Sequence, residues 1–167
     1  MSDPSKKLIV ERKADMIKPR QAFGLCAVNN FIYVAGGASV GEYEKTTERY
    51  DVLNDSWEIL KSCKLPMRMF AQSFITFKKR FIYAFGYSSS DGHKMNKLKL
   101  GGSDKELILK LDTFFLDKGW QILILKSKDV PDGCQYGVLP LSNFSDWRGN
   151  SKSEMIIFGG LNTHSEP

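Results

Sequence analysis

Short runs of apolar residues, each bounded by turn-forming residues, recur along the chain, and their spacing predicts β-strands. The runs Phe23–Val28 and Phe31–Ala35 are separated only by Asn29-Asn30. Because asparagine tolerates the positive φ that a type I′ turn requires, we predict a tight β-hairpin here. A second pair of apolar runs flanks the basic tip Lys78–Arg80. The pattern therefore predicts a chain of strands and turns, an all-β protein.

The same strand pattern repeats with a period of about 50 residues. The segment FIYVAGG at 31–37 recurs 50 positions downstream as FIYAFGY at 81–87, and MIIFGG at 155–160 is a third copy. Two further strand signals follow each of the first two copies in the same order, and the second of these begins at a tryptophan, Trp57 or Trp120. Four antiparallel strands per unit of this length are typical of a β-propeller blade.

These residues resemble the kelch repeat, in which a hydrophobic strand ends in Gly-Gly and is followed by a separated Tyr and Trp. The first unit has every element of that pattern, and the resemblance covers about residues 19–161. The second unit departs from it, because Tyr87 replaces the second glycine and Leu111 replaces the tyrosine. The residues that correspond to the structural kelch motif are Gly36, Gly37, Tyr50, Trp57, Gly86, Trp120, Gly159 and Gly160.

The motif residues have structural roles on physical grounds. A diglycine lets the backbone adopt positive φ and pass close to its neighbour. The two tryptophans bring large apolar faces, so we expect them in the core between adjacent sheets. Tyr87 implies a locally different turn, which makes the segment from Tyr87 to Lys105 the least predictable part of the chain.

The resemblance implies kelch-type propeller blades of four antiparallel strands, about three of them, whereas a closed propeller needs four to eight. We expect a fragment of a longer product; a ring completed by a second copy is the alternative, and open sheet edges make self-association a candidate behaviour. The expected divisions are an N-terminal segment that contributes an outer strand to a preceding blade, repeat 1, repeat 2 with a loop insertion at 88–105, and a partial repeat 3. Their respective bounds are 1–18, 19–66, 67–130 and 131–167.

Composition and charge limit the classes of partner that we expect for this chain. With 42% hydrophobic and 26% charged residues, the 167-residue chain is of ordinary globular type. The net charge of +5 is spread over hairpin tips and loops, so nucleic acid is not an expected partner. No apolar run approaches the roughly 20 residues of a membrane helix, and no secretory signal is recognisable. We therefore expect no membrane partner and a cytoplasmic location, with the nucleus as the alternative.

The apparent catalytic and metal-binding motifs each lack a feature that their chemistry requires, so we expect neither an enzyme nor a cofactor. Gly37–Gly41 matches the GxSxG elbow of hydrolases, but that elbow requires a following helix and a strand is predicted instead. The three cysteines and the two histidines, His93 and His164, have no metal-ligand spacing, so no metal site is expected. A propeller sugar-modifying enzyme would need charged side chains converging on the central channel.

The expected function is non-catalytic binding of a protein partner by loops on the propeller rim. The resemblance assigns this role to residues 38–45, 61–68, 87–105 and 126–135. Arg20 and Arg68 open successive blades; they would bind acidic peptides, or alternatively form salt bridges at the blade boundaries. Trp147 with Arg148 is either an interface anchor or folded onto the third blade. Candidate partner-binding residues are Arg20, Arg68, Tyr43, Tyr87, His93, Trp147 and Arg148.

Kelch domains also serve as substrate receptors of ubiquitin ligases and as cytoskeletal scaffolds, so both roles remain alternatives. No residue of the sequence distinguishes between them, because a fold does not determine a function.

Overall fold

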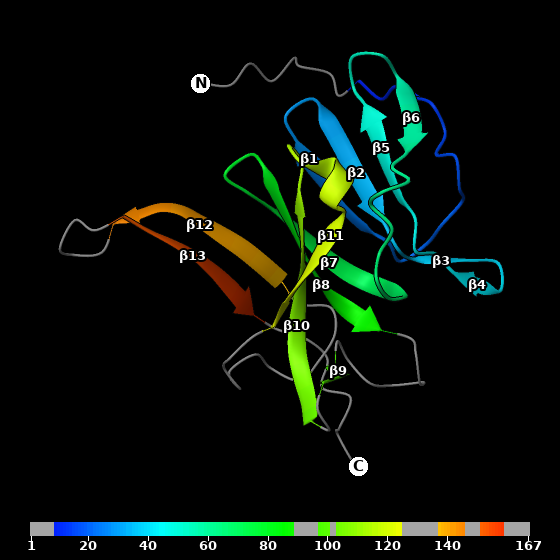
Figure 1. Ribbon diagram of the computed structural model, residues 1–167. Helices are drawn as coiled ribbons and strands as arrows, with labels where there is room; N and C mark the ends of the chain where they lie inside the picture. The colour runs from blue at the N-terminus through cyan, green and yellow to red at the C-terminus, as the bar shows by residue number, and fades with distance from the viewer. Residues whose placement is uncertain (1–8, 89–96, 101–102, 125–136, 146–150, 159–167) are drawn as a thin grey trace, which may run out of the picture.

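The computed structural model describes residues 9–88, 97–100, 103–124, 137–145 and 151–158, and within them it is built from antiparallel strands (Figure 1). No α-helix occurs among these residues, and one 3-10 turn spans Leu116–Lys118. The predicted all-β class is therefore confirmed.

The first sheet has four strands in the spatial order β1-β2-β5-β6. Each strand pairs antiparallel with the one before it, as expected for a propeller blade. A two-stranded hairpin, β3–β4, projects from the connection between β2 and β5. The strand bounds are β1 Gly24–Val28, β2 Phe31–Ala35, β3 Ala38–Ser39, β4 Glu42–Tyr43, β5 Thr47–Asp51 and β6 Ser56–Ile59.

The second sheet repeats this order as β7-β8-β10-β11, and an additional strand, β9, pairs with the beginning of β10. Part of the expected loop insertion at 88–105 is therefore strand, because β10 begins earlier than predicted and forms a hairpin with β9. The bounds are β7 Met69–Phe77, β8 Phe81–Ser88, β9 Lys97–Leu100, β10 Ser103–Asp112 and β11 Trp120–Ile124. The pair β12 (Gly137–Ser145) and β13 (Ser151–Phe158) follows, and β12 contacts β7.

The diglycine after β2 has the geometry that its sequence predicts. Gly36 and Gly37 have φ of 67° and 85°. A Cβ on Gly37 would lie 2.6 Å from the carbonyl oxygen of Gln21 and 2.9 Å from Cβ of Phe23. The Gly37 amide donates a hydrogen bond of 2.8 Å to the carbonyl oxygen of Met69, which joins the two sheets. Only glycine fits this close approach.

The second repeat differs at the corresponding position. Strand β8 does not turn there but continues through Gly86-Tyr87 to Ser88, with an irregularity in its register to β7 between Phe70 and Ser73. A side-chained residue in place of the second glycine thus goes with an extended strand instead of a turn.

The hairpin tips also differ from expectation. Asn29 has a positive φ of 54°, but Asn30 does not, so the connection is not the predicted type I′ turn, which needs positive φ at both positions. At the tip of the second repeat both Lys78 and Lys79 have positive φ, 52° and 50°. The left-handed conformation is unfavourable for side-chained residues, so the lysine tip is locally strained.

The core lies between the two sheets, where β1 contacts β7. Trp120 is 8% exposed, its ring centroid is 5.5 Å from that of Phe74, and its Nε1 donates a hydrogen bond of 2.9 Å to Oγ1 of Thr47. It therefore occupies the predicted core position. The cluster of buried residues is Cys26, Val28, Tyr33, Ala35, Leu60, Cys63, Leu65, Met69, Ile82, Ala84, Leu109, Leu111 and Trp120.

The N-terminal segment follows the first sheet without forming a strand over residues 9–18. Trp57 is only half-buried, with its ring 5.1 Å from Tyr50, and its Nε1 donates to the carbonyl oxygen of Ala14. The Ala14 amide in turn donates to the carboxylate of Asp55. Trp57 thus fastens the N-terminal segment, in contrast to the role between sheets that we expected. The described part of this segment lacks the predicted outer strand, because its amides donate to side chains of the first sheet.

Candidate interaction surface

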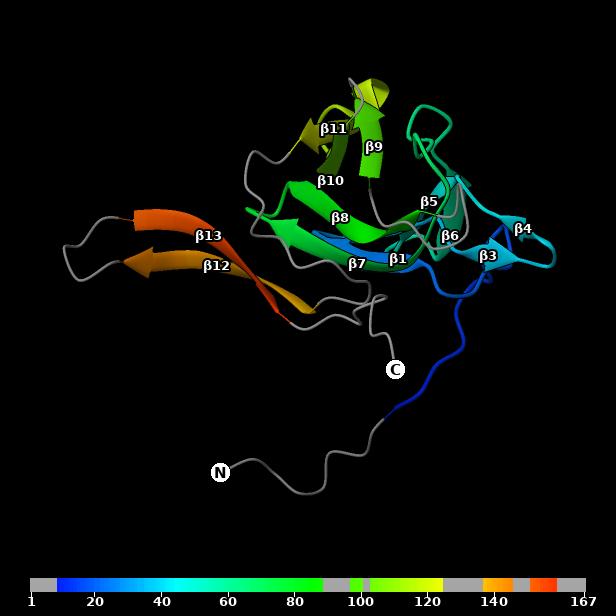
Figure 2. The ribbon, with the colours of Figure 1, turned by 90° about the horizontal axis from the view of Figure 1, so that it is seen from below.

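Two of the loops expected to line the binding rim meet in the structure. The Leu65 amide donates a hydrogen bond of 2.8 Å to the carbonyl oxygen of Lys45, and Nζ of Lys45 donates one of 3.0 Å to the carbonyl oxygen of Pro66. These bonds join the segments 38–45 and 61–68. We call the surface made by residues 19–21, 38–45 and 61–68 the loop face; Figure 2 shows the β3–β4 hairpin projecting at this side of the molecule.

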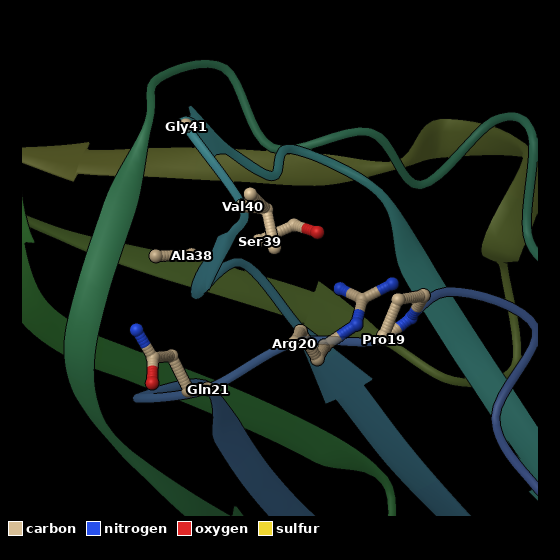
Figure 3. Close-up of a pocket in the computed structure, with 7 residues that line it drawn as sticks. All are labelled: Pro19, Arg20, Gln21, Ala38, Ser39, Val40 and Gly41. Carbon is tan, nitrogen blue, oxygen red and sulfur yellow. The ribbon is translucent and has the colours of Figure 1, made fainter.

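A pocket of about 400 Å³ opens on the loop face, between the chain entering β1 and the β3–β4 hairpin (Figure 3). Gln21 and Ala38 bridge the two walls with a pair of backbone hydrogen bonds of 2.8 Å. A volume of this size is within the range of sites that hold a small ligand or a few side chains. The lining residues are Pro19, Arg20, Gln21, Ala38, Ser39, Val40 and Gly41.

The tip of the β3–β4 hairpin presents an apolar side chain to solvent. Val40 is fully exposed, and Gly41 beside it has a φ of 78°. Ser39 lies in a strand that turns directly into another strand, which is not the strand-to-helix elbow of a serine hydrolase. Sequence reasoning placed this segment in the expected rim loop 38–45 and rejected it as a catalytic motif, but it did not single out Val40. An apolar residue next to a glycine in an otherwise polar loop was the available signal.

Arg20 is buried beneath this surface. Its Nη1 donates to the carbonyl oxygens of Gly36 and Thr46, both at 3.0 Å, and its Nη2 donates to Oγ1 of Thr46 and to the carboxylate of Glu48. Neither the Arg20 nor the Glu48 side chain has any exposed area. Of the two interpretations of Arg20, the structure therefore agrees with a salt bridge at the blade boundary, because these terminal nitrogens are not available to a partner.

Glu48 completes this boundary by accepting from the incoming chain. The backbone amides of Ile17 and Lys18 donate to its carboxylate at 2.9 and 3.2 Å. A buried carboxylate is tolerated when a cation and several donors satisfy it, as they do here. Among the described residues, Nε of Arg20 is the one buried side-chain nitrogen or oxygen without a hydrogen-bond partner.

Arg68, which opens the second repeat, has a different environment. In the second sheet Leu109 stands where Glu48 stands in the first: Glu48 pairs with Val34 and Ile59, and Leu109 pairs with Ala84 and Ile122. Without that carboxylate, Arg68 is exposed, and none of the described residues forms an ion pair with it. The repeat therefore buries one arginine and leaves the other at the surface of the loop face.

Of the remaining candidate residues, the structure describes some and not others. Tyr43 is exposed on β4, and the adjacent Glu44 forms an ion pair of 3.1 Å with Lys18. Tyr87 lies in β8 opposite Phe70. The structure describes its backbone but not its side chain. The other candidate residues lie outside the described residues: His93, Trp147, Arg148, Gly159 and Gly160. Most of the expected rim loops at 87–105 and 126–135 lie outside them as well.

Burial determines the acidity of the two cysteine thiols that the structure describes. Burial raises the pKa of the Cys26 thiol to about 11 and also raises the pKa of the Cys63 thiol, so neither is an activated nucleophile. No group of three or more His, Cys, Asp or Glu residues that could hold a metal occurs in the part of the chain that the structure describes. Likewise, none of the described segments is a helix of the length and apolarity needed to cross a membrane.

Comparison with known proteins identifies the repeat. A model of the Kelch motif matches residues 19–64. Kelch-like protein 15 of Mus musculus is 31% identical over 83 residues, which are 50% of this chain and 13% of that protein. The Homo sapiens protein of the same name is 31% identical over 81 residues, 48% of this chain and 13% of the relative. That of Danio rerio is 39% identical over 49 residues, 29% of this chain and 8% of the relative. The chain thus matches only a small part of the length of these relatives.

Proposed function

Because this chain belongs to the kelch-repeat family, we propose that it is a non-catalytic module whose loop face binds a segment of a protein partner. The kelch motif and the kelch-like relatives support an interaction module, and the loop face supports the particular surface. Rigid sheets hold loops whose side chains vary, which is a common way to build a binding site.

The observation that carries this proposal is the exposed guanidinium of Arg68. Its counterpart in the first repeat is neutralised by a buried glutamate, whereas Leu109 occupies that position in the second repeat. An arginine fork without a carboxylate in the described part of its own chain can bind one from a partner through two parallel hydrogen bonds. We therefore propose that the partner segment places an Asp or Glu side chain at Arg68.

Val40 and the pocket below it supply a neighbouring apolar contact. An exposed valine beside a pocket of about 400 Å³ can bury area with a partner side chain while Arg68 fixes the orientation.

The test is quantitative affinity capture from cells that express the protein, followed by binding measurements with the purified captured partner. We expect Arg68→Ala and Val40→Asp each to weaken binding on the order of tenfold, and Arg68→Lys to restore only part of it, because lysine is a point charge without the fork. Arg12→Ala is the matched control, since Arg12 is exposed and lies outside the loop face. Unchanged binding by both loop-face variants would contradict the proposal.

A further inference from the structure

A second set of exposed side chains lies where the β7–β8 turn meets the connection between β10 and β11. The amide and the hydroxyl of Thr113 both donate to the carbonyl oxygen of Arg80, at 3.1 and 2.7 Å. These bonds hold the two connections together. We call the surface formed there by Lys78, Lys79, Arg80, Phe114, Phe115 and Lys118 the turn cluster.

Arg80 organises the aromatic part of the turn cluster. Its Nε and Nη2 donate to the two carboxylate oxygens of Asp112 at 2.8 and 2.6 Å. Its Cζ also lies 4.8, 4.9 and 5.4 Å from the ring centroids of Phe81, Phe114 and Phe115. A guanidinium fixed by a carboxylate and stacked on aromatic rings holds those rings in one arrangement.

Two of these rings are exposed instead of buried. Phe114 is 65% exposed and Phe115 is 46% exposed, although they are adjacent in a short connection. Nζ of Lys118 lies 4.9 Å from the ring centroid of Phe115. Adjacent exposed aromatic rings that are held in place by a cation are a common feature of binding surfaces.

The lysine tip contributes strain and positive charge. Lys78 and Lys79 both adopt the left-handed conformation and are exposed. Strained residues of this kind cluster at binding and functional sites. Nζ of Lys78 lies 5.4 Å from the ring centroid of Phe77, and no carboxylate of the described residues forms an ion pair with either lysine.

We propose that the turn cluster is a second docking surface, which binds an acidic segment of a protein partner carrying an apolar side chain among its carboxylates. Charge complementarity identifies this occupant. Asp112 is neutralised by Arg80, whereas Lys78, Lys79 and Lys118 form no ion pair with a carboxylate of the described residues. Phe114 and Phe115 supply the apolar half of the match.

The same features favour a protein segment over nucleic acid. Binding a nucleic-acid backbone requires a row of cations that follows the phosphates. Here Arg80 is already paired with Asp112, so the charge of the turn cluster is carried by three lysines that come from two separate connections.

The experiment measures the fluorescence anisotropy of a labelled peptide that has one central leucine flanked by glutamates. We expect the double variant Lys78→Glu, Lys79→Glu to weaken binding on the order of tenfold, and Phe114→Ala to weaken it severalfold. The matched control is Arg12→Glu, Lys13→Glu, which makes the same charge change on the N-terminal segment, where both residues are in exposed ion pairs. The control is expected to change affinity less than about twofold. Thermal melts check folding, and Lys78→Gln, Lys79→Gln replaces the charge-reversed variant if that variant does not fold.

Three results would overturn the proposal. The first is an equal loss of binding in the control, which would indicate attraction to the net charge alone. The second is undiminished binding of a peptide with serine in place of the leucine, since the exposed rings would then contribute nothing. The third is tighter binding of a single-stranded oligonucleotide than of the acidic peptide, which would assign the turn cluster to nucleic acid.

Discussion

The two large sheets share one order of four strands but join the preceding chain in different ways. The first buries the Arg20–Glu48 ion pair, and the second has Leu109 at the position of Glu48. Buried ion pairs add little net stability compared with apolar residues of similar volume, but they are costly to break. The comparison shows that the same four-strand arrangement can have either a buried ion pair or an apolar residue at this position. It also shows that the apolar solution leaves an arginine, Arg68, exposed for another role.

The tryptophans at the start of the outer strands show a second contrast. Trp120 is buried between the sheets and donates to Thr47 of the neighbouring sheet. Trp57 is half-buried and donates to Ala14 of the N-terminal segment. The same motif residue thus joins two sheets in one repeat and fastens an irregular segment in the other.

The largest expected effect comes from truncating these two tryptophans. Trp120→Ala should lower the free energy of unfolding by about 3–5 kcal/mol, because it leaves a cavity in the core between the sheets. Trp57→Ala should cost about 1–2 kcal/mol, since a half-exposed ring loses less burial and one hydrogen bond. Urea unfolding measures both, and Trp120→Phe provides a milder variant if the alanine variant does not fold. Equal costs at the two positions would contradict the contrast between the repeats.

The boundary of the first sheet can be converted to the solution used by the second. Glu48→Leu alone should cost about 3–5 kcal/mol, because it leaves the guanidinium of Arg20 buried without its carboxylate. Adding Arg20→Met should recover part of that loss, since it removes the uncompensated charge but leaves the amides of Ile17 and Lys18 without their acceptor. Chemical unfolding of the single and double variants gives the coupling energy. A double variant no more stable than Glu48→Leu would show that the ion pair does more than fill the boundary.

Much of the fold could be predicted from the sequence, because strand period, turn residues and the diglycine all point to the same blade. The parts that could not be predicted are those whose structure is determined by residues far away in the sequence. Arg20 and Arg68 look equivalent in the sequence, and only the alignment of Glu48 with Leu109 in space separates them. The strand continuing through Tyr87 and the exposed rings near Arg80 likewise depend on neighbouring strands and turns, which local patterns do not contain.

A pH dependence should distinguish the innermost strands of the two sheets. Cys26 of β1 and Ile75 of β7 occupy matching positions, opposite Tyr33 and Tyr83. Burial raises the pKa of the Cys26 thiol to about 11, above the value of about 8.5 for an exposed thiol. The folded state therefore keeps a proton that the unfolded state loses, and stability should fall between about pH 8.5 and pH 11 by up to about 1.4 kcal/mol per pH unit.

Replacing that thiol isolates its contribution to the alkaline loss. Cys26→Val should reduce the dependence of the unfolding free energy on pH above 8.5, while the contributions of Cys63 and Tyr33, whose pKa values burial also raises, remain. Unfolding midpoints measured at several pH values provide the comparison. An identical slope in wild type and variant would rule out the Cys26 thiol as the group responsible.

The smallest expected effect concerns the strained lysine tip of the second sheet. Lys79 has a positive φ of 50°, and the left-handed conformation costs a side-chained residue about 1–2 kcal/mol. Glycine adopts it without that cost but loses more entropy on folding, so Lys79→Gly should stabilise the protein by about 0.5–1 kcal/mol. Asn30→Gly, at a tip position of the first sheet without positive φ, should instead be neutral or slightly destabilising. Thermal melts at a fixed salt concentration distinguish the two. A loss of stability in Lys79→Gly similar to that in Asn30→Gly would mean that the lysine conformation is not strained, and the contrast between the two hairpin tips would then be one of charge alone.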